Sequence, residues 1–148
     1  MRFVVVDTDT GTRPRLRPSL LAAVALGGFL GTLSRYQVGL AWTTPAGHVP
    51  WATLVINVSG AALIGVLGVV ILERFPMIRH LRPFGLTGLL GGWTTMSTLA
   101  VDTVVLGQHH HWAAAAVYVS VTLVASLAAV FVGARLTRLA SFPPVPAG

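Results

Sequence analysis

Cysteine and lysine are both absent from this sequence of 148 residues, and charge of either sign is scarce. Without cysteine, the chain forms no disulfide, no thiolate metal site and no cysteine nucleophile. Only 9% of the residues are charged, against about 25% in an ordinary soluble domain, which argues against a soluble enzyme or a disordered tail. The net charge of +6 and the pI of 11.6 reflect the presence of only four acids. They do not indicate a basic face for nucleic acid.

The sequence is rich in long runs of apolar residues. Hydrophobic residues make up 54% of the chain, and the mean hydropathy is +0.78. A membrane-spanning helix needs about 20 largely apolar residues. Four runs meet this requirement: 20–42, 51–72, 84–106 and 112–136. Because the linkers are short, we predict an all-α membrane protein with one four-helix domain at 20–137, a basic tail at 1–19 and a second tail at 138–148.

The positions of the arginines predict the orientation of these helices. Nine of the ten arginines flank the runs or lie at the end of one, and all nine fall on one side of the membrane: Arg2, Arg13, Arg15, Arg17, Arg74, Arg79, Arg82, Arg135 and Arg138. The loops after the first and third runs contain none. Basic residues concentrate on the cytoplasmic side of membrane proteins. We therefore predict a multi-pass protein of the cell membrane, in contact with membrane lipid, with both termini in the cytoplasm.

Two features of the first run stand out among its apolar residues. Gly27 and Gly31 form a GxxxG pair, which lets helices pack closely in membranes. Arg35 is the only arginine inside an apolar run, and a charge there is costly unless it is paired or reaches the interface. Two interpretations of Arg35 remain open. Its side chain snorkels to the outer surface, or it lines an outer vestibule that attracts anions.

The second run contains one full amide, Asn57, among valine, isoleucine and leucine side chains. A buried amide needs hydrogen-bond partners. The simpler interpretation is a hydrogen bond between helices, which is common in membrane proteins. The functional alternative is a donor aimed at a desolvated anion.

The third run carries the most informative pattern. Gly91-Gly92 is a weak point in a helix, and four hydroxyl residues follow within five positions: Thr94, Thr95, Ser97 and Thr98. A broken helix is tolerated in a membrane only where it is buried in protein or lines a cavity. Such a break frees backbone carbonyls, which are good ligands for hard cations such as Na⁺. We therefore predict a functional break near Gly91-Gly92. Asp102 is either a helix-end acid in water or a partner for an arginine.

The fourth run places Tyr118, Thr122 and Ser126 at four-residue intervals, which puts three hydroxyls on one helix face. A hydroxyl bonded to its own helix backbone is the simpler explanation for any one of them, but three in register favour a polar track. Three consecutive histidines, 109–111, precede this run. Consecutive residues point in different directions, and no carboxylate or cysteine lies nearby. We interpret these histidines as a hydrated loop rather than a metal site.

Three segments together resemble the signature segments of the Fluc (CrcB) fluoride channels. They are GGFLGTLSRY at 27–36, TLVINVSG at 53–60 and GLLGGWTTMSTLAVD at 88–102. Their order, their spacing and the four-helix length also match, so the resemblance covers roughly residues 20–137. It implies a channel of two antiparallel subunits, with two fluoride pores along the interface and one structural Na⁺ at its centre. The implied function is passive fluoride export, which lowers fluoride toxicity in the cytoplasm.

The resemblance also implies roles for individual residues. The carbonyls of Gly91 and Thr94 are implied as Na⁺ ligands, and Arg35 and Asp102 as vestibule residues. The implied pore, or anion path, consists of Asn57, Met96, Ser97, Thr98, Leu99, Tyr118, Thr122 and Ser126. An amide and hydroxyls replace the water around a small anion without a full positive charge that would trap it.

Met96 and Leu99 depart from the family pattern, in which both positions are usually phenylalanine. Phenylalanine rings present positive edges to an anion, whereas Met96 offers a polarizable sulfur and Leu99 offers neither. The one-sided arginines also argue against a chain that inserts in both orientations. Both departures fit a heterodimer in which a homologous, oppositely oriented subunit supplies the rings. A homodimer remains the alternative.

Other classes of function fit the sequence less well. A small multidrug-type proton-coupled exporter is also a four-helix dimer, but it needs a membrane carboxylate, and only Asp102, near the end of the third run, is available. A non-conducting subunit of a heterodimer explains Met96 and Leu99 but not the helix break. Nothing indicates an enzyme, since the sequence shows no nucleophile–base pair and no phosphate loop.

Overall fold

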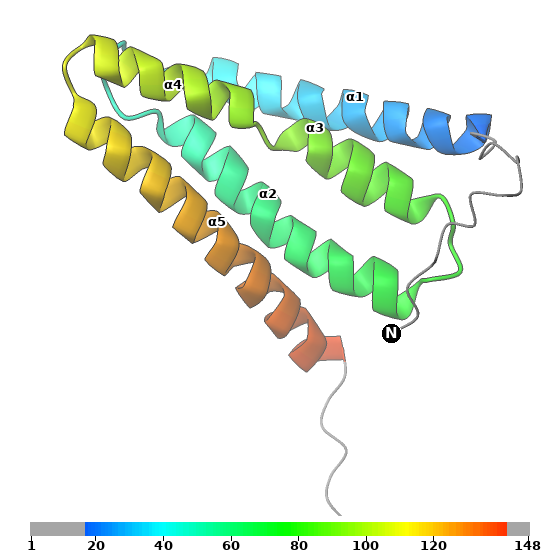
Figure 1. The fold of residues 1–148 in the computed structure, drawn as a ribbon. Helices are drawn as coiled ribbons and strands as arrows, with labels where there is room; N and C mark the ends of the chain where they lie inside the picture. The colour runs from blue at the N-terminus through cyan, green and yellow to red at the C-terminus, as the bar shows by residue number, and fades with distance from the viewer. Residues whose placement is uncertain (1–16, 142–148) are drawn as a thin grey trace, which may run out of the picture.

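The computed structural model describes residues 17–141, and all the regular secondary structure among these residues is helical. The predicted tails at 1–19 and 138–148 lie largely outside the described residues. Four helical stretches are long and apolar enough to cross a membrane: Pro18–Ala41, Trp51–Arg74, Pro83–Gln108 and Trp112–Ala140. The predicted all-α architecture with four membrane spans is therefore confirmed (Figure 1).

The four spans are built from seven helical elements. These are α1 (Pro18–Ala41), α2 (Trp51–Val69), η1 (Val70–Arg74), η2 (Pro83–Leu90), α3 (Gly91–Trp93), α4 (Met96–Gln108) and α5 (Trp112–Ser141). The wider π-helical turns of η1 continue α2, and η2, α3 and α4 together make the third span. The predicted runs agree with these spans, except that α5 extends past the predicted end at residue 136.

The helices associate as two close pairs, α1 with η2 and α3, and α2 with α5 (Figure 1). Small residues allow both approaches. A methyl group at Gly27 or Gly31 would overlap the backbone of the third span, and one at Gly65 would overlap the backbone of α5. The GxxxG pair therefore acts in packing, as small residues do between membrane helices. Since α1 and α2 make few contacts with each other, the third span, which contacts both, joins the two pairs.

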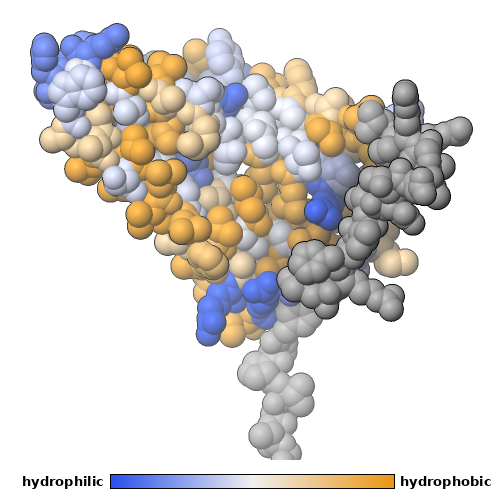
Figure 2. All heavy atoms as spheres, in the orientation of Figure 1, coloured by the Kyte–Doolittle hydropathy of each residue, from blue (hydrophilic) through white to orange (hydrophobic). Residues whose placement is uncertain are grey.

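The two ends of the molecule carry different side chains. Trp42, Trp51 and Trp112 are exposed at the end formed by the α1–α2 loop and the α4–α5 turn. Tryptophan gathers at membrane–water interfaces. The flanking arginines that the structure describes lie at the other end: Arg17, Arg74, Arg79, Arg82, Arg135 and Arg138. The others, Arg2, Arg13 and Arg15, lie outside the described residues. Hydrophobic residues cover much of the face between the two ends (Figure 2).

Candidate ion-binding site at the helix break

The third span is broken at Thr94 and Thr95, where the backbone is extended, with φ and ψ of −72° and 156° at Thr94 and −150° and 115° at Thr95. Gly91 itself stays helical, at −63° and −32°. The predicted break near Gly91-Gly92 is thus present, and it begins after Trp93, the residue that follows the glycines. Gly92 instead provides room, because a methyl group there would overlap the carbonyl of Gly28 in α1. The β-branched threonines favour extended backbone, which explains why the helix stops at them.

On each side of the break, a threonine side chain forms a hydrogen bond with the backbone of the neighbouring helix. Thr94 donates through both its N–H and its hydroxyl to the carbonyl of Leu90, at 3.0 Å each, and the N–H bond is the last of the helical type before the break. Thr95 is the N-cap of α4, and its Oγ1 accepts the N–H of Thr98 at 3.1 Å. An N-cap of this kind stabilises a helix by about 1 kcal/mol. The sequence did not predict Thr95 as a site residue. A threonine directly before a helical segment is, however, a common N-cap, and this pattern could have identified it.

Asn57 of α2 forms two hydrogen bonds with the backbone of the break. Its Oδ1 accepts the N–H of Thr95 at 2.8 Å, and its Nδ2 donates to the carbonyl of Thr95 at 3.0 Å. The side chain is buried. A hydrogen bond between helices is therefore the interpretation of Asn57 that the structure supports. A second polar contact from α2 reaches α3, because Trp93 Nε1 donates to Ser59 Oγ at 3.1 Å.

These hydrogen bonds leave two carbonyls without their usual helical donors. In a continuous helix, the N–H of Thr95 would reach the carbonyl of Gly91, and the N–H of Thr98 would reach the carbonyl of Thr94. Both N–H groups donate to side chains instead. Gly91 is also exposed, with nothing within 4 Å of the position where a side chain would begin. The two predicted Na⁺ ligands are therefore freed carbonyls, the kind of ligand that hard cations bind.

Acidic and histidine side chains are the other groups that could bind a metal ion. No group of three or more histidines, aspartates and glutamates able to hold a metal ion occurs within residues 17–141. His109, His110 and His111 are all exposed in the turn between α4 and α5. For a cation, the described part of the chain thus offers the carbonyls of the break.

Arg35 of α1 also reaches the break. Its Nε donates to the carbonyl of Gly92 at 3.1 Å, and Thr32 Oγ1 lies 3.5 Å from the same oxygen. Gly92 belongs to the last turn of α3, where carbonyls lack helical donors and the helix dipole is negative. One N–H of the Arg35 guanidinium is therefore partnered by a backbone carbonyl at the break.

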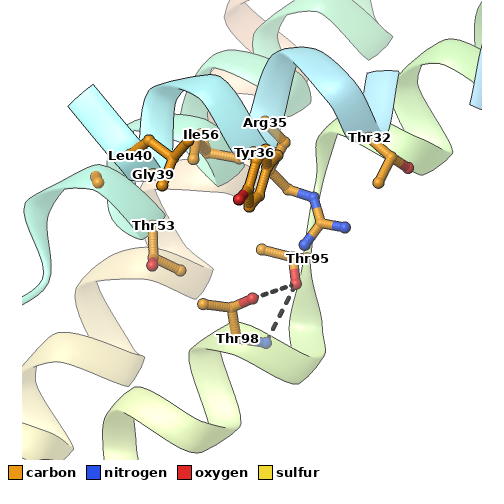
Figure 3. A pocket seen from close by; sticks show the side chains of 10 residues that line it. Thr32, Arg35, Tyr36, Gly39, Leu40, Thr53, Ile56, Thr95 and Thr98 are labelled. Carbon is orange, nitrogen blue, oxygen red and sulfur yellow. Dashed lines mark hydrogen bonds between the residues drawn. The ribbon is translucent and has the colours of Figure 1, made fainter. Parts of the chain in front are cut away.

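A cavity of about 280 Å³ lies between α1, α2 and the break (Figure 3). It is lined by Thr32, Arg35, Tyr36, Gly39, Leu40, Ala52, Thr53, Ile56, Thr95 and Thr98. Arg35 is the only charged residue among them, and hydroxyls supply most of the other polar groups. The Thr95 hydroxyl donates to Thr98 Oγ1 at 2.9 Å and lies 3.2 Å from Ser97 Oγ. Thr53 and Tyr36 also line the cavity, but the sequence did not predict them as site residues. They lie near Arg35 only in the folded structure, and no sequence pattern indicates this.

Two of the three hydroxyls predicted to form a track on α5 donate hydrogen bonds to other groups of the protein. Tyr118 is buried, and its hydroxyl donates to Asp102 Oδ2 at 3.1 Å. Thr122 is also buried, and it donates to the Tyr118 carbonyl of its own helix at 2.7 Å. Within the described residues, the buried Oγ of Ser126 has no hydrogen-bond partner. Asp102 is thus partnered by a tyrosine rather than by an arginine, and Ser126 retains a free hydroxyl.

Met96 and Leu99 lie in different environments. Met96, the first residue of α4, is 67% exposed. Leu99 is 3% exposed and packs with Leu106, Ala115 and Tyr118 in the hydrophobic core. Of the two positions that depart from the phenylalanine pattern, only Met96 is therefore accessible, and Leu99 is a core residue of this chain.

These features define a class of protein: a small four-span membrane protein whose third span is broken around freed carbonyls, hydroxyls and one partnered arginine. The model of the CrcB-like protein family, Camphor Resistance (CrcB), matches residues 22–134. The chain belongs to this family.

Curated relatives carry the name fluoride-specific ion channel. FluC 3 of Streptomyces avermitilis is 49% identical over 128 residues, which are 86% of this chain and 63% of that protein. FluC 2 of Nocardia farcinica is 45% identical over 128 residues, 86% of this chain and 91% of that protein. A second protein of Streptomyces avermitilis, FluC 2, is 47% identical over 104 residues, 70% of this chain and 66% of that protein. The match thus spans just under two thirds of the two Streptomyces relatives and most of the Nocardia relative.

Proposed function

We propose that this chain is a subunit of a fluoride-specific channel of the cell membrane, through which fluoride leaves the cytoplasm passively and its toxicity is lowered. The observation that carries the proposal is the cavity at the helix break, which lies within a membrane-spanning bundle and is lined by hydroxyls and one partnered arginine. The names of the relatives support the same ion.

The chemistry of the cavity suits a small anion. Fluoride is strongly hydrated, so a selective path replaces its water with donors that approach closely, and it binds the ion weakly enough to release it. The hydroxyls of Thr53, Thr95 and Thr98 can rotate to donate, and the Arg35 guanidinium attracts an anion toward them. Because Arg35 already donates to the Gly92 carbonyl, its charge is partly compensated, which reduces trapping.

A structural Na⁺ at the break is part of the proposal. The carbonyls of Gly91 and Thr94 would hold it, since the N–H groups that would normally bond them donate to Asn57 and Thr95. Bound Na⁺ would supply a fixed positive charge that holds these carbonyls in place. Two carbonyls are fewer ligands than a hard cation takes, so matching carbonyls from a second subunit would complete the site.

Exposed polar residues on α1 support an assembly of two antiparallel subunits. Ser34 and Gln37, three residues apart and so on one face, are exposed on a helix long and apolar enough to span a membrane. Polar groups that face hydrocarbon without partners are costly. A second subunit would cover this face of α1 together with Met96, and it would bring its own broken helix.

The partner is either a second copy or a homologous chain, and we favour the homologous chain. The described flanking arginines all lie at the end opposite Trp42, Trp51 and Trp112, which supports one fixed orientation with both termini in the cytoplasm. A chain of fixed orientation needs an oppositely oriented homologue to form an antiparallel pair. Two proteins of this kind occur in Streptomyces avermitilis, so more than one such chain in a genome has a precedent.

The experiment that tests the function is fluoride efflux from proteoliposomes, followed with a fluoride electrode, with chloride as the control ion. The purified chain is assayed alone and together with a homologous chain from the same genome. Flux only with the homologue supports the heterodimer, and flux from the chain alone supports a conducting homodimer. Absence of flux in both preparations would contradict the channel and favour an exporter or a non-conducting subunit. Equal release of chloride would contradict fluoride specificity.

A further inference from the structure

We infer that Asn57 acts through the helix break: its amide withholds the Thr95 N–H from the Gly91 carbonyl and so keeps that carbonyl free for Na⁺. Asn57 is thus a positioning residue for the cation site, a role distinct from the pore role that the family resemblance implies. The inference rests on the proposed Na⁺ site and adds to it a residue that does not touch the cation.

Asn57 Oδ1 and the Gly91 carbonyl compete for one hydrogen. The Thr95 N–H has a single hydrogen, and in a continuous helix it would donate to the carbonyl of Gly91. It donates to Asn57 Oδ1 at 2.8 Å instead. Thr95 is buried, and a buried N–H must find an acceptor. Without Asn57 Oδ1, extension of α3 by one more hydrogen bond would satisfy this N–H, and the Gly91 carbonyl would then be occupied.

Asn57 forms a second bond with the same residue. Its Nδ2 donates to the carbonyl of Thr95 at 3.0 Å, so one side chain holds both backbone groups of one residue. A residue held in this way stays extended, in agreement with the φ of −150° and ψ of 115° at Thr95. An aliphatic side chain at residue 57 would lose both bonds, whereas a carboxyl group would keep the acceptor and lose the donor.

The location of Asn57 separates this role from a role in the anion path. Asn57 is 7% exposed and does not line the cavity that contains Arg35, whereas Thr53 and Ile56 of the same helix do. Ser59 instead contacts α3, by accepting from Trp93 Nε1, and this contact leaves the Gly91 carbonyl untouched. Ser59 therefore provides a matched control on the same helix.

The experiment measures the melting temperature of the purified channel in detergent, in sodium chloride and in N-methylglucamine chloride. An ion that binds only the folded protein raises its melting temperature. We expect a Na⁺-dependent rise for the unaltered channel, for Ser59→Ala and for Asn57→Asp, which retains an acceptor for the Thr95 N–H. The rise should be lost in Asn57→Leu, which removes the acceptor with little change in size.

Three results would overturn the inference. A full Na⁺-dependent rise in Asn57→Leu, together with loss of fluoride efflux, would make Asn57 a pore donor only. Loss of the rise in Asn57→Asp would also contradict the inference, and this variant decides the matter if Asn57→Leu does not fold. If the unaltered channel shows no rise, the proposed Na⁺ site itself is wrong, and that failure is recognised without any variant.

Discussion

The Nε of Arg35 donates to the carbonyl of Gly92 across 3.1 Å, so that a charge from α1 partners the last turn of α3. The carbonyl needs a donor because the break at Thr94 and Thr95 removes the N–H that would otherwise reach it. The arginine needs an acceptor because it lies inside an apolar span. The carbonyl and the half-buried arginine therefore partner each other.

Loss of this contact should lower both stability and fluoride efflux. Arg35→Gln removes the charged donor to Gly92 and the only charge that lines the cavity. A hydrogen bond to a charged group contributes about 1.5–3 kcal/mol, and we expect a loss of that size in the free energy of unfolding, measured by denaturant unfolding in detergent. Arg74→Gln, at an exposed residue outside the cavity, is the control. Equal effects of the two substitutions would contradict the role of Arg35.

Two glycines of α1 should respond in opposite ways to the same substitution. A methyl group at Gly31 would overlap the Leu89 carbonyl, whereas nothing lies within 4 Å of one at Gly39. Gly31→Ala should destabilise the protein by about 1–3 kcal/mol, the usual cost of overpacking. Gly39→Ala should be neutral or stabilising by up to about 1 kcal/mol, because alanine favours a helix more than glycine does. Thermal unfolding of the two variants side by side makes the comparison, and a tolerated Gly31→Ala would refute the close packing of α1 on the third span.

The two positions that lack phenylalanine should also differ. Met96→Phe places a ring at an exposed position, and we expect it to raise fluoride efflux from proteoliposomes that contain this chain alone. Leu99→Phe forces a larger side chain into the core beside Tyr118 and should cost about 1–3 kcal/mol of stability without a gain in efflux. A gain from Leu99→Phe alone would mean that Leu99 faces the anion path.

Substitution of Asp102 distinguishes a passive channel from a proton-coupled exporter. Asp102→Asn removes the only carboxylate that a proton-coupled cycle could use but retains an acceptor for the Tyr118 hydroxyl, which donates to Asp102 at 3.1 Å. Passive fluoride efflux should therefore persist in the variant. Abolished transport in a folded Asp102→Asn protein, with transport in the parent driven by a pH gradient, would favour the exporter.

The contact between Tyr118 and Asp102 is expected to contribute to stability as well. Tyr118→Phe leaves a carboxylate without its donor, and we expect a loss of about 1–3 kcal/mol in the free energy of unfolding. Tyr36→Phe is the matched control, since the Tyr36 side chain is exposed. A Tyr118→Phe protein as stable as the control would show that the contact contributes nothing.

Several features of the site were predictable from single-helix patterns. Glycines spaced for close packing at Gly27 and Gly31, and a break next to Gly91-Gly92, are local properties of the sequence, and the structure contains both. The α5 track was predictable only in part. The register of Tyr118, Thr122 and Ser126 on one face follows from helical periodicity, but periodicity does not say that Thr122 bonds its own backbone or that Tyr118 bonds Asp102.

The sequence by itself determined the four membrane spans and the difference between the two ends of the molecule. Bilayer thickness sets the length of an apolar run, and the interfaces select tryptophan and arginine, so both features can be read along the chain. Only the tertiary structure decided which side chains from other helices bond the backbone around the break. Asn57 and Thr95 are 38 residues apart, and Arg35 and Gly92 are 57 apart. The physical reason is that the groups of a broken helix take their hydrogen-bond partners from neighbouring helices, and no pattern within one helix specifies those partners.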